Sequence, residues 1–203
     1  GAGRRDAAQF AEAIESAGGE LGAGAGTESL SLSANFLAKD VGLMLELAGD
    51  ALLRPRLDPA EFEKARTLAI QSIAAAKDSD PRALIGAYGD ARLFRGQAYG
   101  RPVDGDEGSL AAVTLDDVKS YFAGQVRGDR AIIVVVGDFA AADMKRRLEA
   151  TFGGWGRAAG AAPAAQAAPR VAGRRVLLVD KPGAAQTYFW LGNVGASRTD
   201  PAR

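Results

Sequence analysis

Apolar residues recur at helical spacing along much of the chain. In the first such segment Phe10, Ile14 and Ala17 fall on one face, and a glycine pair follows and ends it. A longer segment opens with Asp58 and Pro59, which are favourable as a helix cap and as a first-turn residue. Patterns of this kind predict helices over residues 6–17, 40–53, 59–79, 81–94, 114–124 and 141–152.

Three other stretches have the pattern of β-strands. In residues 28–36, Leu30 and Leu32 alternate with serines, which is typical of a strand with one solvated face. Residues 20–25 form an extended segment before it, and residues 130–136 are a short apolar run typical of an interior strand. Because strands and helices are interleaved without strict alternation, we predict an α+β fold, a mainly antiparallel sheet with helices packed against it.

The last quarter of the chain changes in character. Residues 156–174 are almost entirely Ala, Gly and Pro without periodicity, which indicates a linker. Residues 175–195 then predict two strands around a Lys-Pro-Gly turn. The sequence starts at Gly1 without a methionine and stops within polar residues, which favours a piece of a longer protein, so that a missing leader carries little meaning.

Composition disfavours several classes of function. Lys+Arg and Asp+Glu are both 25, so no net charge attracts nucleic acid, and no apolar run is long enough to span a membrane. The chain has neither histidine nor cysteine, so it offers no imidazole or thiolate for catalysis or for zinc. Chemistry within this sequence would depend on carboxylate, lysine, tyrosine or hydroxyl groups.

Several phrases in serial order carry a resemblance to a known family. They are IESAGGELGAGAGTESLSLS, DALLRPRLDPAEFEKAR, GRPVDGDEGSLAAVTLDDVKSYF, AIIVVVGDF and VDKPGAAQTYFWLG. In this order they resemble the insulinase/pitrilysin-type zinc peptidases, and in particular the bacterial members related to mitochondrial processing peptidase. The resemblance extends from Gly1 to about Asn193.

The resemblance implies a protein of two homologous α+β domains of the insulinase or processing-peptidase type. Residues 1–155 would be the first domain without its N-terminal part, residues 156–174 the linker, and residues 175–203 the opening strands of the truncated second domain.

Catalytic relatives carry a His-x-x-Glu-His helix, which supplies two zinc ligands and a general base and would lie upstream of Gly1. A glutamate on a later helix is their third ligand, and the resemblance places it at Ser72 or, with a slip of one residue, at Gln71. Neither has a carboxylate, and Glu63 lies too far back along the helix to replace it. The resemblance therefore implies a degenerate metal-ligand position at Ser72, with no catalytic residue, metal or cofactor in this chain. A glutamate introduced at Ser72 is expected to cost stability if the position is buried.

The same resemblance suggests a peptide-binding edge. In catalytic relatives a substrate peptide pairs with the main chain of the matching strand, which here comprises Leu21, Gly22, Ala23, Gly24 and Ala25. A plain strand turn is the simpler interpretation. A phosphate-binding glycine loop is disfavoured, because these glycines lead into a strand and not into a helix.

Two classes of function stay open. The first is a non-catalytic subunit that helps to form a peptide-binding chamber with a catalytic zinc-peptidase partner in a dimer, and has no peptidase activity alone. The alternative is a fragment of an active zinc endopeptidase whose His-x-x-Glu-His motif lies upstream. A weaker third possibility is a structural scaffold, as in the respiratory-complex core subunits of the same fold. The expected partners are the catalytic subunit and peptide substrate, without nucleic acid or a membrane span. The export of many bacterial relatives suggests a periplasmic location, although the compartment stays open.

Overall fold

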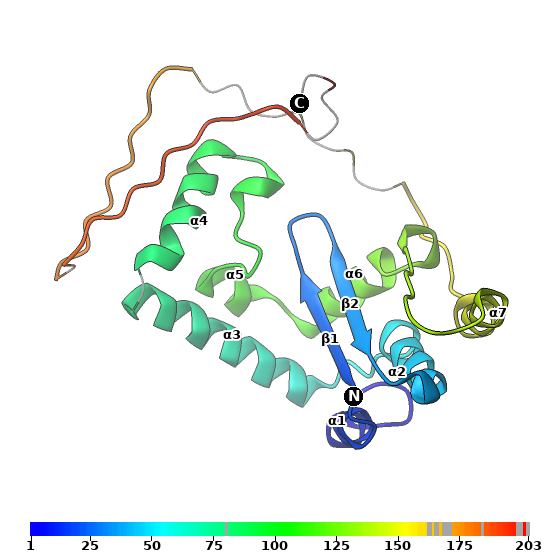
Figure 1. The fold of residues 1–203 in the computed structure, drawn as a ribbon. Helices are drawn as coiled ribbons and strands as arrows, with labels where there is room; N and C mark the ends of the chain where they lie inside the picture. Colours follow the sequence, from blue (N-terminus) through cyan, green and yellow to red (C-terminus); the bar gives the residue numbers. More distant parts are fainter. Residues whose placement is uncertain are drawn as a thin grey trace. The chain divides into compact units, whose positions relative to one another are not determined.

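The computed structural model describes residues 1–79, 81–161, 164, 167, 172–183, 185–197 and 201 (Figure 1). The helices are α1 (Ala7–Ser16), α2 (Val41–Leu53), α3 (Pro59–Ser79), α4 (Pro81–Leu93), α5 (Glu107–Ala112), α6 (Leu115–Gln125) and α7 (Ala141–Phe152), and the strands are β1 (Glu20–Ala25) and β2 (Leu30–Asn35). Short 3-10 turns occupy Ala38–Asp40, Ala98–Gly100 and Gly128–Arg130. The predicted helices are all present with bounds within one residue or so, and α5 is an additional helix that the pattern did not predict.

The chain divides into two compact units. The first comprises Gly1–Ala65 and Val113–Ala162, and the second comprises Arg66–Ala112 and Pro163–Arg203. Each unit is a group of residues that contact one another within this chain. The predicted succession of domains, 1–155, 156–174 and 175–203, refers to a longer protein and stays a prediction.

In the first unit, β1 and β2 form an antiparallel hairpin in which Glu20 pairs with Asn35 and Ala25 with Leu30. Since directly opposite residues share a face, one face of the hairpin carries small and polar residues and the other carries leucine and alanine. The polar face consists of Glu20, Gly22, Gly24, Ser31, Ser33 and Asn35. The predicted alternation of residues 28–36 is therefore confirmed.

The core of the first unit lies along α2. Leu45 and Leu47 are buried on this helix, and Met144 of α7 is buried as well. A β-carbon at Gly49 of α2 would lie 2.8 Å from Cγ2 of Thr151, which shows how closely α2 and α7 approach. Apolar burial of this kind is the main source of stability for helices that pack in pairs.

Local capping explains where two of the helices begin. Thr114 accepts a hydrogen bond from the backbone N–H of Asp117, whose carboxylate accepts one from the N–H of Thr114, a complete capping box at α6. Asp6 and Gln9 form the same motif at α1. Thr114 with Asp117 three residues later is the sequence pattern of such a box.

The α+β class is confirmed, but the prediction of a mainly antiparallel sheet is wrong. Among the residues that the structure describes, helices predominate and the only sheet is the hairpin β1–β2. Residues 131–136 form no strand, and Ile132 and Val136 are each 91% exposed. The described parts of 175–195 form no strand either. A run of β-branched residues favours extended backbone, whereas a strand also requires a neighbouring chain to pair with, which a local pattern does not specify.

Candidate functional site

The position that the resemblance assigned to a third metal ligand lies in the middle of α3. Gln71 and Ser72 are both exposed, and neither has a charged group. The expectation from the sequence was a stability cost for a glutamate at Ser72 if the position were buried. Its exposure removes the premise of that cost.

The chemistry of these residues does not suit zinc. Structural and catalytic zinc sites use thiolate, imidazole and carboxylate ligands, and the chain has no cysteine or histidine. Within the described ranges, no three or more Asp or Glu residues come together in a group that could hold a metal ion. A hydroxyl at Ser72 is too short and too weak a donor to replace a glutamate. No catalytic step can therefore be derived through zinc on these residues.

The best-organised polar cluster lies elsewhere, at the end of α2, and sequence reasoning missed it. Asp50 is only 5% exposed. Its Oδ1 accepts hydrogen bonds from Nε of Arg54 at 2.9 Å and from Nη2 at 2.5 Å, and its Oδ2 lies 3.5 Å from Nη1 of Arg5. The same Arg5 nitrogen, Nη1, lies 2.8 Å from Oε1 of Glu46. A buried carboxylate needs such partners because desolvation would otherwise be costly.

The N-terminal segment is fitted onto this cluster. The N–H of Gly3 donates to the carbonyl of Arg54 at 2.8 Å, and Ala2 bridges to Pro55. Gly3 has φ +58°, and a β-carbon there would lie 2.2 Å from Oδ2 of Asp50. Only glycine meets both requirements. A cavity of about 880 Å³ beside the cluster is lined by Gly3, Arg4, Arg5, Gln9, Glu46, Asp50 and Arg54.

This cluster could have been suspected from two signals in the sequence. Asp50 and Arg54 stand four residues apart on one helix, which is the spacing of a helical ion pair. Gly3 lies next to an Arg-Arg pair. The contact between Arg5 and Asp50 could not be predicted from a local sequence pattern, because the two residues are 45 positions apart.

The hairpin supplies the predicted peptide-binding edge. The N–H of Gly26 donates to the carbonyl of Ser29 at 2.8 Å, which fixes that pair as hydrogen-bonded. Hydrogen-bonded and non-bonded pairs alternate in an antiparallel ladder, so the backbone groups of residues 20, 22 and 24 face β2. Those of Leu21, Ala23 and Ala25 face the opposite edge. Along the described chain no backbone hydrogen bond outside the hairpin is made by these three residues.

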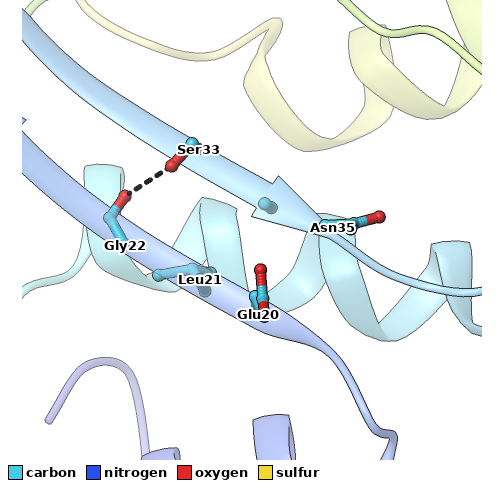
Figure 2. Close-up of a pocket in the computed structure, with 6 residues that line it drawn as sticks. Glu20, Leu21, Gly22, Ser33 and Asn35 are labelled. Carbon is cyan, nitrogen blue, oxygen red and sulfur yellow. Dashed lines mark hydrogen bonds between the residues drawn. The ribbon is translucent and has the colours of Figure 1, made fainter.

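A hollow of about 320 Å³ lies at the end of this hairpin away from its turn. It is lined by Glu20, Leu21, Gly22, Ser33, Ala34 and Asn35. Figure 2 shows the Ser33 hydroxyl donating to the carbonyl of Gly22 across the two strands, a contact of 3.4 Å. A β-carbon at Gly22 would come no closer than 3.8 Å to Oγ of Ser33, so the surface at Gly22 is open.

The second unit contains a charge pair at the end of α3. Nζ of Lys77 lies 2.5 Å from Oε2 of Glu107, the first residue of α5. The hydrogen bond from Lys77 lowers the pKa of Glu107, and the same bond raises the pKa of Lys77. Both side chains remain partly exposed, so this is a modest surface pair.

The C-terminal segment contacts α3 and α4 within the same unit. Nζ of Lys181 donates to the carbonyls of Lys77 and Asp78 at 2.5 and 3.0 Å, where the last carbonyls of α3 lack helical partners. The ring of Trp190 lies where a β-carbon of Gly89 would be, 2.3 Å from that position. These contacts have the character of packing and capping.

Comparison with known proteins places the chain in a family. The model of the insulinase family, peptidase family M16, matches residues 1–107, and the model of the peptidase M16 inactive domain matches residues 112–203. An uncharacterized zinc protease of Mycobacterium leprae is 30% identical over 93% of this chain and 42% of its own length. The β subunit of the mitochondrial-processing peptidase of Blastocladiella emersonii is 24% identical over 69% of this chain and 30% of its own length.

Solved structures agree at the level of the fold. A peptidase M16 inactive domain from Pseudomonas fluorescens has a TM-score of 0.76 with 20% identity, over 83% of this chain and 41% of that one. Pitrilysin has a TM-score of 0.70 with 15% identity, over 83% of this chain and 18% of its own.

The fold is thus that of an α+β domain of the peptidase type. The chain belongs to the insulinase family, peptidase family M16. The N-terminal part matches the peptidase domain and the C-terminal part the inactive domain. Zinc proteases are named among the relatives. The chain spans about two fifths of the length of the M. leprae relative. No helix in the described ranges has the length and apolar character needed to cross a bilayer.

Proposed function

We propose that this chain is part of a non-catalytic member of the insulinase family, which helps a catalytic zinc-peptidase subunit to form a peptide-binding chamber. The observation that carries the proposal is Ser72, an exposed hydroxyl on α3 at the position that the family resemblance assigns to a glutamate ligand. A subunit without this ligand keeps the helix and loses the means to hold zinc.

The role in the chamber is peptide binding along β1. The free backbone groups of Leu21, Ala23 and Ala25 lie on one edge of the hairpin and offer a ladder for an extended peptide. The described residues of β1 are mostly exposed, which supports access from solvent.

The alternative function is that of an active zinc endopeptidase whose His-x-x-Glu-His motif lies upstream. The observation in its favour is that relatives of similar sequence are named zinc proteases. It requires another side chain to supply the ligand that is missing at Ser72.

A cleavage assay of the full-length protein separates the two functions. We expect no cleavage of unfolded peptides by the protein alone, with zinc added, and an increase over the catalytic subunit's own rate when the two are mixed. Metal analysis after dialysis should find zinc well below one ion per chain. Cleavage by the protein alone, or one tightly bound zinc per chain, would overturn the non-catalytic function. Light scattering of the mixture reports whether the two subunits form a dimer.

Peptide binding at β1 is tested by a proline at the edge. Ala23→Pro removes an N–H that points away from β2, so the hairpin tolerates it while an added peptide loses a hydrogen bond. Ala23→Ser keeps the N–H and is the matched control. We expect weaker peptide binding for the proline variant alone. Equal binding by both variants would contradict binding along this edge.

A further inference from the structure

The geometry of β1 determines which side chains of an added peptide lie on the polar face of the hairpin. A peptide that pairs with the outward groups of Leu21, Ala23 and Ala25 places its intervening residues opposite Glu20, Gly22 and Gly24. Opposite residues share a face, so these intervening side chains lie on the polar face of the hairpin. The residue opposite Gly22 meets no side chain on β1, because Gly22 has none.

Glu20 gives this hollow its chemistry. Its side chain is exposed, and among the described residues its carboxylate makes no hydrogen bond or ion pair. Diagonal neighbours on one face of a sheet are about 7–8 Å apart, which a long side chain can bridge. A side chain opposite Gly22 is therefore within reach of the Glu20 carboxylate if it is long, and is attracted to it if it is cationic.

We propose that Glu20, with the open surface at Gly22, forms a subsite for a lysine or arginine side chain of a peptide that pairs with β1. This inference rests on the proposed peptide-binding function. The opposite face, with Leu21, Ala23 and Ala25, takes short or apolar side chains by the same alternation. The segment bound would accordingly be extended, with a basic residue at the position opposite Gly22.

The experiment measures binding of blocked, fluorescent peptides to the full-length protein by anisotropy. Their sequence alternates valine with a variable residue, which is threonine, lysine or glutamate throughout a given peptide. A shift of the peptide by two residues keeps every side chain on its face, so the result does not depend on one register. The protein variants are Glu20→Gln, which removes the charge at constant shape, and Glu12→Gln, a matched charge removal on exposed α1.

We expect the lysine peptide to bind the wild type about two- to fivefold more tightly than the threonine peptide, the range of an exposed ion pair, and the glutamate peptide to bind less tightly. The preference should shrink at higher salt and disappear in Glu20→Gln, and it should persist in Glu12→Gln. Equal binding of the lysine and threonine peptides overturns the subsite while leaving peptide binding along β1 intact. A lysine preference that survives in Glu20→Gln also overturns the subsite. Binding of none of the peptides overturns the peptide-binding function itself, and the subsite with it.

Discussion

The end of α2 and the middle of α3 treat polar residues in opposite ways. On α2, Asp50 is buried and held by Arg5 and Arg54, and Gly3 leaves the space that its carboxylate requires. On α3, Gln71 and Ser72 are uncharged and exposed.

The difference shows what a fixed carboxylate costs this protein. Burial of a carboxylate is unfavourable unless charged donors form hydrogen bonds to it and the neighbouring backbone leaves room for it, as at Asp50. Ser72, in contrast, is exposed and uncharged, whereas a metal ligand at this position would need the same support. The ordered carboxylate of this comparison is therefore the structural one at Asp50, and α3 has none at Ser72.

The largest expected effect is that of Gly3→Ala. A β-carbon would lie 2.2 Å from Asp50 Oδ2, and alanine would have to adopt φ +58°. We expect a loss of about 2–5 kcal/mol in the free energy of unfolding, from the left-handed backbone and from overpacking together. Denaturant unfolding of the full-length protein measures it.

Gly18→Ala is the matched control, because Gly18 has φ +60° and open space around its missing β-carbon. It should cost only about 1–2 kcal/mol, the backbone part of the effect. If the two variants were equally destabilised, the close contact with Asp50 would have no energetic weight.

Asp50→Ala tests the buried cluster directly. Removal of a carboxylate that accepts hydrogen bonds from two guanidinium groups should cost about 1.5–3 kcal/mol. Ser72→Ala, the corresponding truncation on α3, should change stability by less than about 0.5 kcal/mol. Similar values for both variants would remove the contrast between the helices.

The exposed pair at the end of α3 should show a smaller effect that depends on pH. The pKa of Glu107 is lowered from 4.5, so its stabilisation is complete above pH 4.5 and disappears as the pH falls through the lowered value. The pKa of Lys77 is raised from 10.5, so its stabilisation is complete below pH 10.5 and disappears as the pH rises through the raised value.

Melting temperatures of the wild type and of Glu107→Gln, followed over this range, check the prediction. The wild type should have a higher melting temperature than Glu107→Gln between about pH 5 and pH 10. The difference between the two melting temperatures should vanish in acid below that window. A difference that persists at pH 2 would exclude the ion pair as its cause.

The smallest effect on stability is expected for Ser72→Glu. Because the position is exposed, the new carboxylate keeps its hydration, and stability should stay within about 0.5 kcal/mol of the wild type. No peptidase activity should appear with added zinc, alone or beyond that of the wild type in the mixture with a catalytic subunit. Activity gained by this single substitution would show that the remaining ligands are present, and would favour the active endopeptidase.

Much of the fold could be predicted from the sequence because the signals were local. Caps, prolines and glycines fixed the helix ends, so α3 begins at Pro59 and ends at Ser79 as expected. Alternating serines and leucines revealed β2. The sheet was overestimated because residues 131–136 have strand composition, whereas pairing depends on a distant partner.

For the sites, the sequence and the family resemblance supplied positions but not their surroundings. The exposure of Ser72 could not be seen from its apolar neighbours in the sequence. Arg5 and Asp50 come together only through folding. The hollow beside Glu20 depends on the register between the strands, which the alternation in one strand alone does not specify.

The exposed run at residues 131–136 has a consequence for solubility. It contains six consecutive apolar residues, mostly β-branched, without charge or proline, and such segments stack readily between copies of a chain. Ile132, Val134 and Val136 are strongly exposed. Arg130 and Asp138 flank the run and act as gatekeepers, since stacked copies would bring like charges together. Replacing these two flanking residues by neutral ones should therefore promote aggregation of the newly made protein before it alters the folded state.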